Sequence, residues 1–381
     1  WRVFMKKKIL IVDDSALMRR VLSDIINKDD RFCVADVARN GETALALLNE
    51  NPQKYDAVLL DFFMPDMNAD ELLLHLDLRR MKAKVIVISG IIKSDAMEII
   101  HALEHGAFDF VTKPENFVIA KEKHFEEKLL QCIELATSQE ETMGVMQKST
   151  TVKRPLRREK PISINSITKG NGKGSVRGGK LIALACSTGG PKALHQVIPK
   201  LPPNLAAPMI VVQHMPKGFT KSLAERLDEM SQLHVKEAED GDVLSKGTVY
   251  IAKGGSQLRV DSKGGKKILR VTEEAARNGL KPCADIMYES LVESDYEEIV
   301  CVVLTGMGGD GTEGIRQLSK KNNIYSITQT ADTCTVYGMP KVFYQSGLAD
   351  EILPLQDIAD AIRKHCLLYT SPSPRDKRQS R

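Results

Sequence analysis

The segment Leu181-Ile-Ala-Leu-Ala-Cys-Ser-Thr-Gly-Gly-Pro191 joins an apolar run to a turn of small residues. Leu181–Ala185 predicts a buried strand, and Pro191 stands where it would occupy the first turn of a following helix. Similar apolar runs recur along the chain, separated by stretches with apolar residues three or four positions apart. This alternation predicts a mostly parallel α/β fold, in which ligands gather at the carboxyl ends of the strands.

The chain has 381 residues, which is enough for two domains of ordinary size. Residues 5–138 predict one doubly wound α/β domain, and residues 180–366 predict a second one. Residues 139–179 are poor in apolar side chains and rich in Lys, Thr, Asn and Gly, so we expect a flexible linker there. Trp1–Phe4 and residues 367–381 show no periodicity, and we interpret them as non-native sequence or disordered tails.

Nine short apolar runs are the expected strands of the two domains. They are Ile9–Val12, Cys33–Asp36, Ala57–Leu60, Lys84–Ile88 and Ala107–Val111, followed by Leu181–Ala185, Met209–Val212, Val249–Ala252 and Ile299–Leu304. A helical pattern near His365 closes the second domain.

The net charge of +4 is unevenly distributed. Residues 148–180 carry +9 and residues 371–381 carry +3, which leaves −8 on the rest of the chain. Because the positive charge lies in segments expected to be flexible, nucleic acid is not an expected partner. Seven scattered cysteines without a Cys-x-x-Cys pair favour the cytoplasm, and the absence of an 18-residue apolar run argues against membrane insertion.

Carboxylates follow two of the expected strands in the first domain. Asp13 and Asp14 come after the first strand, and Asp61 follows the third. Three carboxylates in one place repel each other unless a cation intervenes, and Mg²⁺ prefers such oxygen ligands. Asp61 could then attack a phosphoryl group, with Lys113 and Ser89 contacting its oxygens. The alternative is that these residues form ordinary surface turns.

Three motifs of this domain resemble the receiver domain of two-component response regulators. They are Ile11-Val-Asp-Asp-Ser-Ala-Leu-Met-Arg-Arg20, Leu60-Asp-Phe-Phe-Met-Pro65 and Gly106-Ala-Phe-Asp-Phe-Val-Thr-Lys-Pro114. The resemblance implies a flavodoxin-like fold and a phosphoryl group received on Asp61 from a histidine kinase. It also implies further roles, with Mg²⁺ held by Asp13, Asp14, Asp61 and the carbonyl of Phe63, and a switch set of Ser89, Phe110 and Lys113.

The second domain places Ser187, His214 and Asp310 after three different strands. Ser187 lies on a strand-to-helix turn, where its hydroxyl would be exposed beside helix amides. His214 follows Met209–Val212, and Asp310 follows Ile299–Leu304. The three could meet as a Ser-His-Asp triad, although their chain order differs from the familiar hydrolase orders. The alternative for Ser187 is a simple helix N-cap.

A dinucleotide site is a second interpretation of the same region. Gly306-Met-Gly-Gly-Asp-Gly311 fits the G-x-G-x-x-G pattern, and Asp332 stands about 20 residues further on, as that motif requires. Against this, Asp310 would place a carboxylate at the helix N-terminus where the pyrophosphate should lie.

The order of motifs in this half resembles the catalytic domain of chemotaxis protein-glutamate methylesterases. These motifs are Ser187-Thr-Gly-Gly-Pro191, Gln213-His-Met-Pro216, Ala238-Glu-Asp-Gly-Asp242, Val249-Tyr-Ile-Ala252, Leu304-Thr-Gly-Met-Gly-Gly-Asp-Gly311 and Val336-Tyr-Gly-Met-Pro340. The resemblance implies Ser187, His214 and Asp310 as the triad, with the Met307 amide as an oxyanion donor.

That family implies a phosphorylation-activated hydrolase of glutamate methyl esters on methyl-accepting chemoreceptors. Methanol would be released without a cofactor, and glutamine could be deamidated by the same acyl chemistry. The alternative is a response regulator whose second domain only binds a dinucleotide or a partner.

Overall fold

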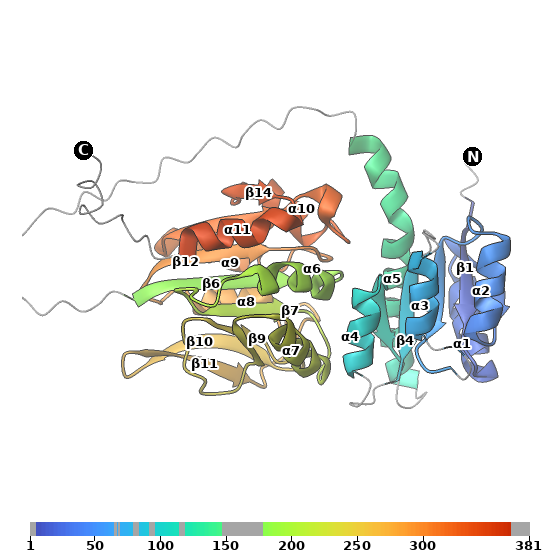
Figure 1. Ribbon diagram of the computed structural model, residues 1–381, viewed down its shortest axis with the longest axis horizontal. Coiled ribbons are helices and arrows are strands. Elements are labelled where there is room, and N and C mark those ends of the chain that lie inside the picture. The colour runs from blue at the N-terminus through green and yellow to red at the C-terminus, as the bar shows by residue number, and fades with distance from the viewer. Residues whose placement is uncertain are drawn as a thin grey trace, which may run out of the picture.

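Buried apolar strands form two separate parallel sheets in the computed structural model (Figure 1). It describes residues 5–64, 67, 69–78, 84–90, 96–113, 119–146 and 178–366. The expected terminal tails and most of the expected linker lie outside the described residues. Both sheets confirm the expected α/β class, and the second sheet is parallel throughout its strand pairs.

The first sheet has the order β2-β1-β3-β4-β5. Its strands are β1 (Lys7–Val12), β2 (Phe32–Ala38), β3 (Ala57–Asp61), β4 (Val85–Ser89) and β5 (Asp109–Thr112). Its helices are α1 (Ala16–Lys28), α2 (Gly41–Glu50), α3 (Ala69–Leu78), α4 (Ala96–Glu104) and α5 (Ile119–Met146). Alternate strand residues face two hydrophobic clusters, because successive side chains of a strand point to opposite sides.

The second sheet has the order β14-β13-β12-β6-β7-β9-β8. Its strands are β6 (Gly178–Cys186), β7 (Met209–Gln213), β8 (His234–Glu237), β9 (Thr248–Ile251), β12 (Tyr296–Val303), β13 (Ile324–Gln329) and β14 (Glu351–Leu353). An antiparallel hairpin of β10 (Gln257–Lys263) and β11 (Lys266–Thr272) stands apart from it. The sequence did not predict β8, β10, β11, β13 or β14.

Helices cover both faces of this sheet. They are α6 (Gly190–Val197), α7 (Phe219–Met230), α8 (Ala284–Ser290), α9 (Thr312–Lys321), α10 (Met339–Gln345) and α11 (Leu355–Cys366), with short 3-10 turns η2 (Ile198–Lys200) and η3 (Ala331–Thr333). Residues of α6, α7 and α11 share one hydrophobic cluster with the sheet, and residues of α8, α9 and α10 share the other. The expected helix near His365 is α11.

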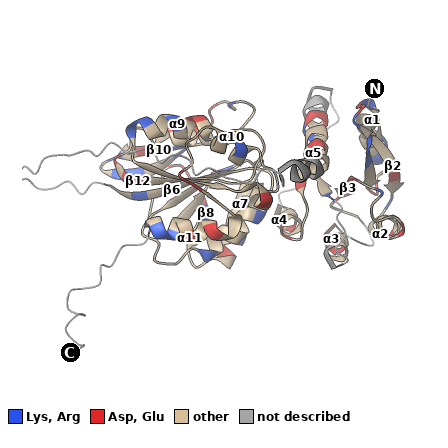
Figure 2. Ribbon diagram, turned by 90° about the horizontal axis from the view of Figure 1, so that it is seen from above, with Lys and Arg blue, Asp and Glu red and all other residues tan. Residues whose placement is uncertain are grey.

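The segment between the sheets differs from its expected extent. Helix α5 continues to Met146, well inside residues 139–179, and β6 already begins at Gly178. Basic and acidic residues are interspersed over the helices of both domains (Figure 2). In the part of the chain that the structure describes, no helix is both long and apolar enough to cross a membrane.

The contact between α8 and α9 requires glycine at position 314. A Cβ added there would lie 2.7 Å from the carbonyl oxygen of Asp285 and 2.8 Å from Cβ of Tyr288, and neither atom can move without shifting the backbone of α8. We expect Gly314→Ala to lower the free energy of unfolding by about 1–3 kcal/mol, despite the better helix propensity of alanine. Denaturant unfolding would measure this.

Lys320→Ala is the matched control, since Lys320 is exposed on the same helix. It should change stability by less than about 0.5 kcal/mol. A Gly314→Ala protein as stable as wild type would mean that α8 and α9 pack less closely than described.

Candidate functional site

Ser187 follows β6, a central strand of the second sheet. Cys186, the last residue of the strand, pairs with Gln213 of β7, so Ser187 stands one residue beyond the paired edge. The Ser187 amide donates to the Thr305 carbonyl at 3.0 Å, which fixes the turn. The N-cap of α6 is Gly189 with φ of 76°, so the interpretation of Ser187 as a simple N-cap is wrong.

The two glycines after Ser187 are needed for close approach. A Cβ on Gly190 would lie 1.9 Å from Oε1 of Gln213, and one on Gly189 would lie 2.2 Å from Cβ of Thr335. The positive φ of Gly189 also favours glycine. The Gly-Gly pair therefore lets the nucleophile turn lie directly against β7 and the loop that holds Thr335.

The turn that carries His214 is tied to the turn that carries Ser187. The Gln213 side chain is 2 % exposed, and its Nε2 donates to the carbonyls of Ser187 at 3.0 Å and His214 at 3.1 Å. The His214 amide donates to the Cys186 carbonyl at 3.1 Å. These bonds hold the two turns side by side.

His214 and Asp310 form a direct hydrogen bond. Nε2 of His214 lies 2.7 Å from Oδ2 of Asp310, and the two side chains are 10 % and 6 % exposed. Burial alone would raise the pKa of Asp310, but the hydrogen bond and charge of His214 and two backbone amides hold it well below its usual range. Asp310 is therefore ionised at neutral pH.

The Ser187 hydroxyl lies on the turn that Gln213 ties to the His214 turn. Within the described residues, no hydrogen bond joins it to His214. Because Nε2 of His214 is engaged by Asp310, Nδ1 is the ring nitrogen available to Ser187. The triad assignment of the three residues thus stays a prediction, with its His-Asp half formed.

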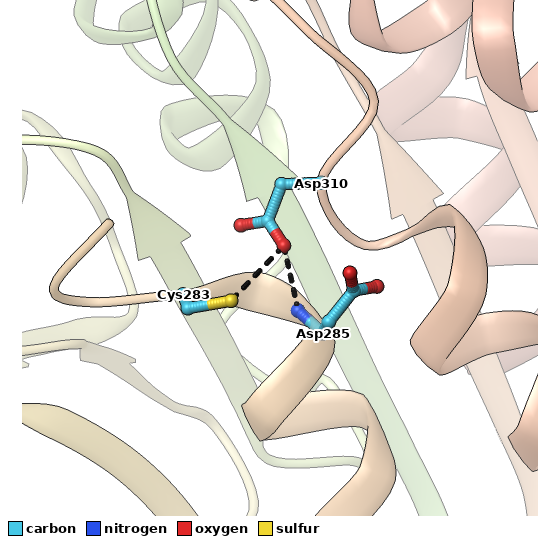
Figure 3. A group of neighbouring side chains, drawn as sticks. All are labelled: Cys283, Asp285 and Asp310. Carbon is cyan, nitrogen blue, oxygen red and sulfur yellow. Dashed lines mark hydrogen bonds between the residues drawn. The ribbon is translucent and has the colours of Figure 1, made fainter. Parts of the chain in front are cut away.

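The Asp310 carboxylate accepts four further hydrogen bonds, of which Figure 3 shows those from Cys283 and Asp285. The amides of Ala284, Asp285 and Gly311 lie 2.6, 3.0 and 3.0 Å from its oxygens, and Sγ of Cys283 lies 3.2 Å from Oδ1. Both oxygens therefore face donors from the start of α8 as well as His214.

The loop before Asp310 lies against Ser187. A Cβ on Gly306 would lie 2.7 Å from Cβ of Ser187, and the Gly306 carbonyl accepts from the amides of Gly338 and Met339. In the described part of the chain, the Met307 amide that follows donates no hydrogen bond. It stays the predicted oxyanion donor.

The first domain brings its expected carboxylates together. Ligand oxygens of Asp13, Asp14 and Asp61 lie within 4.8 Å of one another, with Asp13 and Asp61 buried and Asp14 exposed. Nζ of Lys113 lies 3.0 Å from Asp13 and 2.8 Å from Asp61. Burial raises the pKa of Asp61 to about 6, against the opposing charge of Lys113 and with a contribution from Asp13 and Asp14.

This donor set fits Mg²⁺. It consists of hard carboxylate oxygens, and the burial and mutual repulsion of Asp13 and Asp61 are relieved by a second cation beside Lys113. Phe63 is the second residue after β3 and is 45 % exposed. Its carbonyl stays a predicted ligand.

The expected switch residues surround the end of β5. Ser89 is fully buried, its hydroxyl donates to the Gly90 carbonyl at 3.1 Å, and its own carbonyl accepts from the Lys113 amide at 2.7 Å. Phe110 is buried and its ring lies 4.8 Å from that of Phe219 in α7. One switch residue therefore contacts the second domain.

Comparisons with known proteins agree with both sites. Residues 182–362 match the family model of the CheB methylesterase, and residues 9–121 match that of the response regulator receiver domain. The protein-glutamate methylesterase/protein-glutamine glutaminase of Halalkalibacterium halodurans is 38 % identical over 359 residues, covering 94 % of this chain and 98 % of that protein. The chain belongs to the CheB methylesterase family.

A second curated relative and one solved structure are also similar to this chain. The protein of the same name from Geobacillus kaustophilus is 39 % identical over 360 residues, covering 93 % of this chain and 97 % of that protein. The catalytic domain of the Thermotoga maritima CheB methylesterase has a crystal structure that aligns at 41 % identity over 49 % of this chain and 98 % of that chain, with a TM-score of 0.47. The CheB family resemblance expected from the motifs is confirmed.

CheB family membership does not favour the dinucleotide interpretation, and neither does the loop geometry. Gly311, with φ of 89°, is the N-cap of α9, but the carboxylate of Asp310 beside it is bound to α8 and His214. Asp332 lies in η3. The glycines of this loop thus serve to place Asp310.

Sequence reasoning missed Cys283 and Asp285. With Asp310 they are spaced closely enough to hold a metal ion. However, burial and the charge of Asp310 raise the pKa of Cys283 to about 12, so the thiol stays protonated and is not in the form that binds a metal. A cysteine directly before a short helix was the one sequence signal, and it pointed to no role.

We expect Lys113→Ala to destabilise the receiver domain. Asp13 and Asp61 would face each other without the lysine, which should lower the free energy of unfolding by roughly 2–3 kcal/mol. Because the remaining site is more negative, Mg²⁺ should raise the melting temperature of the variant more than that of wild type. Thermal scans with and without Mg²⁺ measure both effects.

The control is Lys6→Ala, since Lys6 pairs with Asp30 on the surface. It should alter stability by less than about 1 kcal/mol and leave the Mg²⁺ response unchanged. Equal Mg²⁺ responses in Lys113→Ala and wild type would contradict the predicted metal site.

Proposed function

We propose that this chain is a phosphorylation-activated methylesterase that hydrolyses glutamate methyl esters on methyl-accepting chemoreceptors. The observation that carries the proposal is the 2.7 Å bond between His214 and Asp310, formed where Gln213 ties the His214 turn to the Ser187 turn. A buried, ionised carboxylate on an imidazole beside a half-buried serine turn is the arrangement of a serine hydrolase. Family membership supports the substrate class.

The reaction would proceed through an acyl-enzyme. Oγ of Ser187 attacks the ester carbonyl while Nδ1 of His214 takes the hydroxyl proton, and Asp310 stabilises the imidazolium. The imidazolium returns the proton to the departing methoxide, so methanol leaves. Water then attacks the glutamyl-serine ester with His214 as base, which releases glutamate and restores Ser187.

The negative charge of the tetrahedral intermediate needs a donor in the loop after β12. The Met307 amide fits this role because the neighbouring Gly306 lies against Ser187. A donor of this kind contributes about 3–4 kcal/mol to the transition state. The same acyl chemistry would deamidate glutamine, with ammonia leaving in place of methanol.

The first domain would control this reaction through phosphorylation by a histidine kinase. Asp61 is the proposed phosphoacceptor, and Asp13, Asp14 and the Phe63 carbonyl would hold Mg²⁺ beside it. The ion, when bound, neutralises charge on the phosphoryl oxygens. Lys113 and Ser89 would contact those oxygens and register the modification. The seven unpaired cysteines support a cytoplasmic location.

Docking of the receiver against the catalytic domain would block large substrates. The hydroxyl of Thr188, next to the nucleophile, donates to Oδ2 of Asp109 at 2.6 Å. The ring of Phe110 packs on Phe219, and Val336 of the catalytic domain lies in one hydrophobic cluster with receiver residues, against which Met307 packs. Receiver residues therefore lie directly beside Ser187 and the proposed oxyanion donor, where a receptor helix would have to bind.

An ion pair fixes the other side of this interface. Glu104 of α4 accepts two hydrogen bonds from Arg226 of α7, at 3.0 and 3.2 Å, and α4 faces α6 and α7 (Figure 1). Burial would raise the pKa of Glu104, but Arg226 holds it below its usual range. His195 lies 3.2 Å from the same carboxylate, yet its burial lowers its own pKa, so Arg226 is the main cation.

Ser187→Ala should abolish methanol release from methylated receptor membranes, by at least about a thousandfold, because the acyl-enzyme cannot form. Phosphoryl incorporation at Asp61 from a small phosphodonor with Mg²⁺ should be unchanged. Ser262→Ala, at an exposed serine of β10, is the matched control and should keep full activity. Retained hydrolysis in Ser187→Ala would refute the assignment of the nucleophile.

Glu104→Ala should raise the activity of the unphosphorylated protein. Losing both bonds to Arg226 weakens docking by about 1–2 kcal/mol, which corresponds to a roughly 5- to 30-fold larger open population while the docked state dominates. Activation by phosphodonor should shrink by the same factor. Methanol release with and without phosphodonor measures both.

Glu98→Ala tests whether any change on α4 has this effect, since Glu98 is exposed on the same helix. It should behave as wild type. Inhibition by docking would be wrong if Glu104→Ala had the basal activity of wild type.

A further inference from the structure

The carboxylate of Asp310 binds His214 and also caps the N-terminus of helix α8. Cys283 is the N-cap residue of α8, and its side chain makes no cap hydrogen bond within its own helix. The first amides of the helix, from Ala284 and Asp285, donate to Asp310 instead. The Cys283 thiol points to the same carboxylate, as Figure 3 shows.

The buried side chain of Gln257 holds the backbone of Cys283. The Cys283 amide donates to Oε1 of Gln257 at 2.8 Å, and Nε2 of Gln257 donates to the carbonyls of Ala275 and Leu280. Gln257 is fully buried and Cys283 is 1 % exposed. A fully hydrogen-bonded, buried Gln257 side chain therefore holds the backbone of Cys283 beside Asp310, within reach of the thiol.

The thiol is the donor in its contact with Asp310. An ionised carboxylate only accepts hydrogen bonds, and Asp310 is ionised. Burial, with the nearby negative charge of Asp310, raises the pKa of Cys283 to about 12, so Sγ carries its proton at neutral pH. Oδ1 thus receives the thiol, and Oδ2 receives the imidazole.

We propose that Cys283 is a positioning residue for the triad, whose thiol holds Oδ1 of Asp310 so that Oδ2 is directed at Nε2 of His214. This inference rests on the proposed function. Among the described residues, His214 and Cys283 are the only side chains that donate to this carboxylate. The other three donors are the backbone amides of Ala284, Asp285 and Gly311. The thiol is the only donor to Oδ1 among these described residues that is a side chain.

The test compares two replacements of Cys283 in the full-length protein. Cys283→Ser keeps a donor, whereas Cys283→Val removes the donor and fills its space with methyl groups. With phosphodonor and Mg²⁺ present, we expect Cys283→Ser to stay within about twofold of the wild-type kcat for methanol release. Cys283→Val should lose about three- to tenfold in kcat, the range for one hydrogen bond of ordinary strength, as expected for a weak thiol donor, with KM for methylated receptor unchanged.

Cys301→Val is the matched control, since Cys301 is fully buried in β12 and makes no contact with the triad through its thiol. It should keep the wild-type kcat. The inference is overturned if Cys283→Val equals wild type, or if Cys283→Ser loses as much activity as Cys283→Val. The first result would show that the donor is not needed, and the second that only the size of the side chain matters.

A proton NMR measurement separates this inference from the proposed reaction, because it needs no substrate. The low-field resonance of the His214–Asp310 hydrogen bond should shift in Cys283→Val and keep its wild-type position in Cys283→Ser and Cys301→Val. If wild type released no methanol but the resonance followed this pattern, the substrate assignment would fail and the positioning role would stand. An unchanged resonance in Cys283→Val would overturn the positioning role.

Discussion

The parallel register of β12, β6 and β7 is the constraint on which the catalytic site depends. Val303 pairs with Ala185, and Cys186 pairs with Gln213, so the three strands end at one level. Side chains that follow these strands must then meet at the same edge, as in other open α/β sheets. Leu181–Cys186, Met209–Gln213 and Ile299–Val303 are buried, with alternate side chains in two different hydrophobic clusters, so a slip of one residue would exchange the side chains of the two clusters. Hydrophobic packing thereby sets the catalytic geometry.

The key carboxylates of the two domains are both buried, but their different neighbours shift their pKa values in opposite directions. Asp61 is buried among carboxylates with Lys113 as its cation, and its pKa is raised to about 6. Asp310 is also buried, but amides, a thiol and an imidazole surround it, and its pKa is lowered. The environment of Asp61 favours binding of a cation and is suited to transfer of a phosphoryl group to its carboxylate. The environment of Asp310 keeps a permanent negative charge that needs no further partner, which suits a residue that orients a base.

The sequence predicted the residues that follow strands better than the elements around them. Ser187, His214 and Asp61 stand directly after apolar runs, so periodicity and turn chemistry located them. The hairpin β10–β11 was missed because its exposed residues interrupt the apolar pattern, and it packs only through a few side chains such as Leu258 and Leu269. Helix α5 passes the expected boundary since Gln139-Glu-Glu-Thr-Met143 has good helix formers despite its polar composition.

Cys283 and Asp285 could not be predicted for a different reason. They reach Asp310 across 27 and 25 residues of chain, through a fold that neither periodicity nor a local motif describes. Their role depends on the start of α8 facing the loop after β12, which is a property of tertiary packing. Local sequence patterns locate a nucleophile on its own turn, but the groups that orient its partners come from elsewhere in the fold.

Strand β5 joins the two sites physically. Lys113, next to its carboxyl end, pairs with Asp61, while Asp109 and Phe110 within it contact Thr188 and Phe219. The strand has four residues and spans about 13 Å. Because the strand is so short, we expect it to move as a rigid unit. A phosphoryl group on Asp61 that binds Lys113 would then also displace Asp109 and Phe110, which contact Thr188 and Phe219. Among the described residues, the interface that it must release includes the Glu104–Arg226 ion pair, the Phe110–Phe219 ring contact and the Thr188–Asp109 hydrogen bond, beside apolar packing. The differential free energy needed to open such an interface is a few kcal/mol, the scale that one modification supplies.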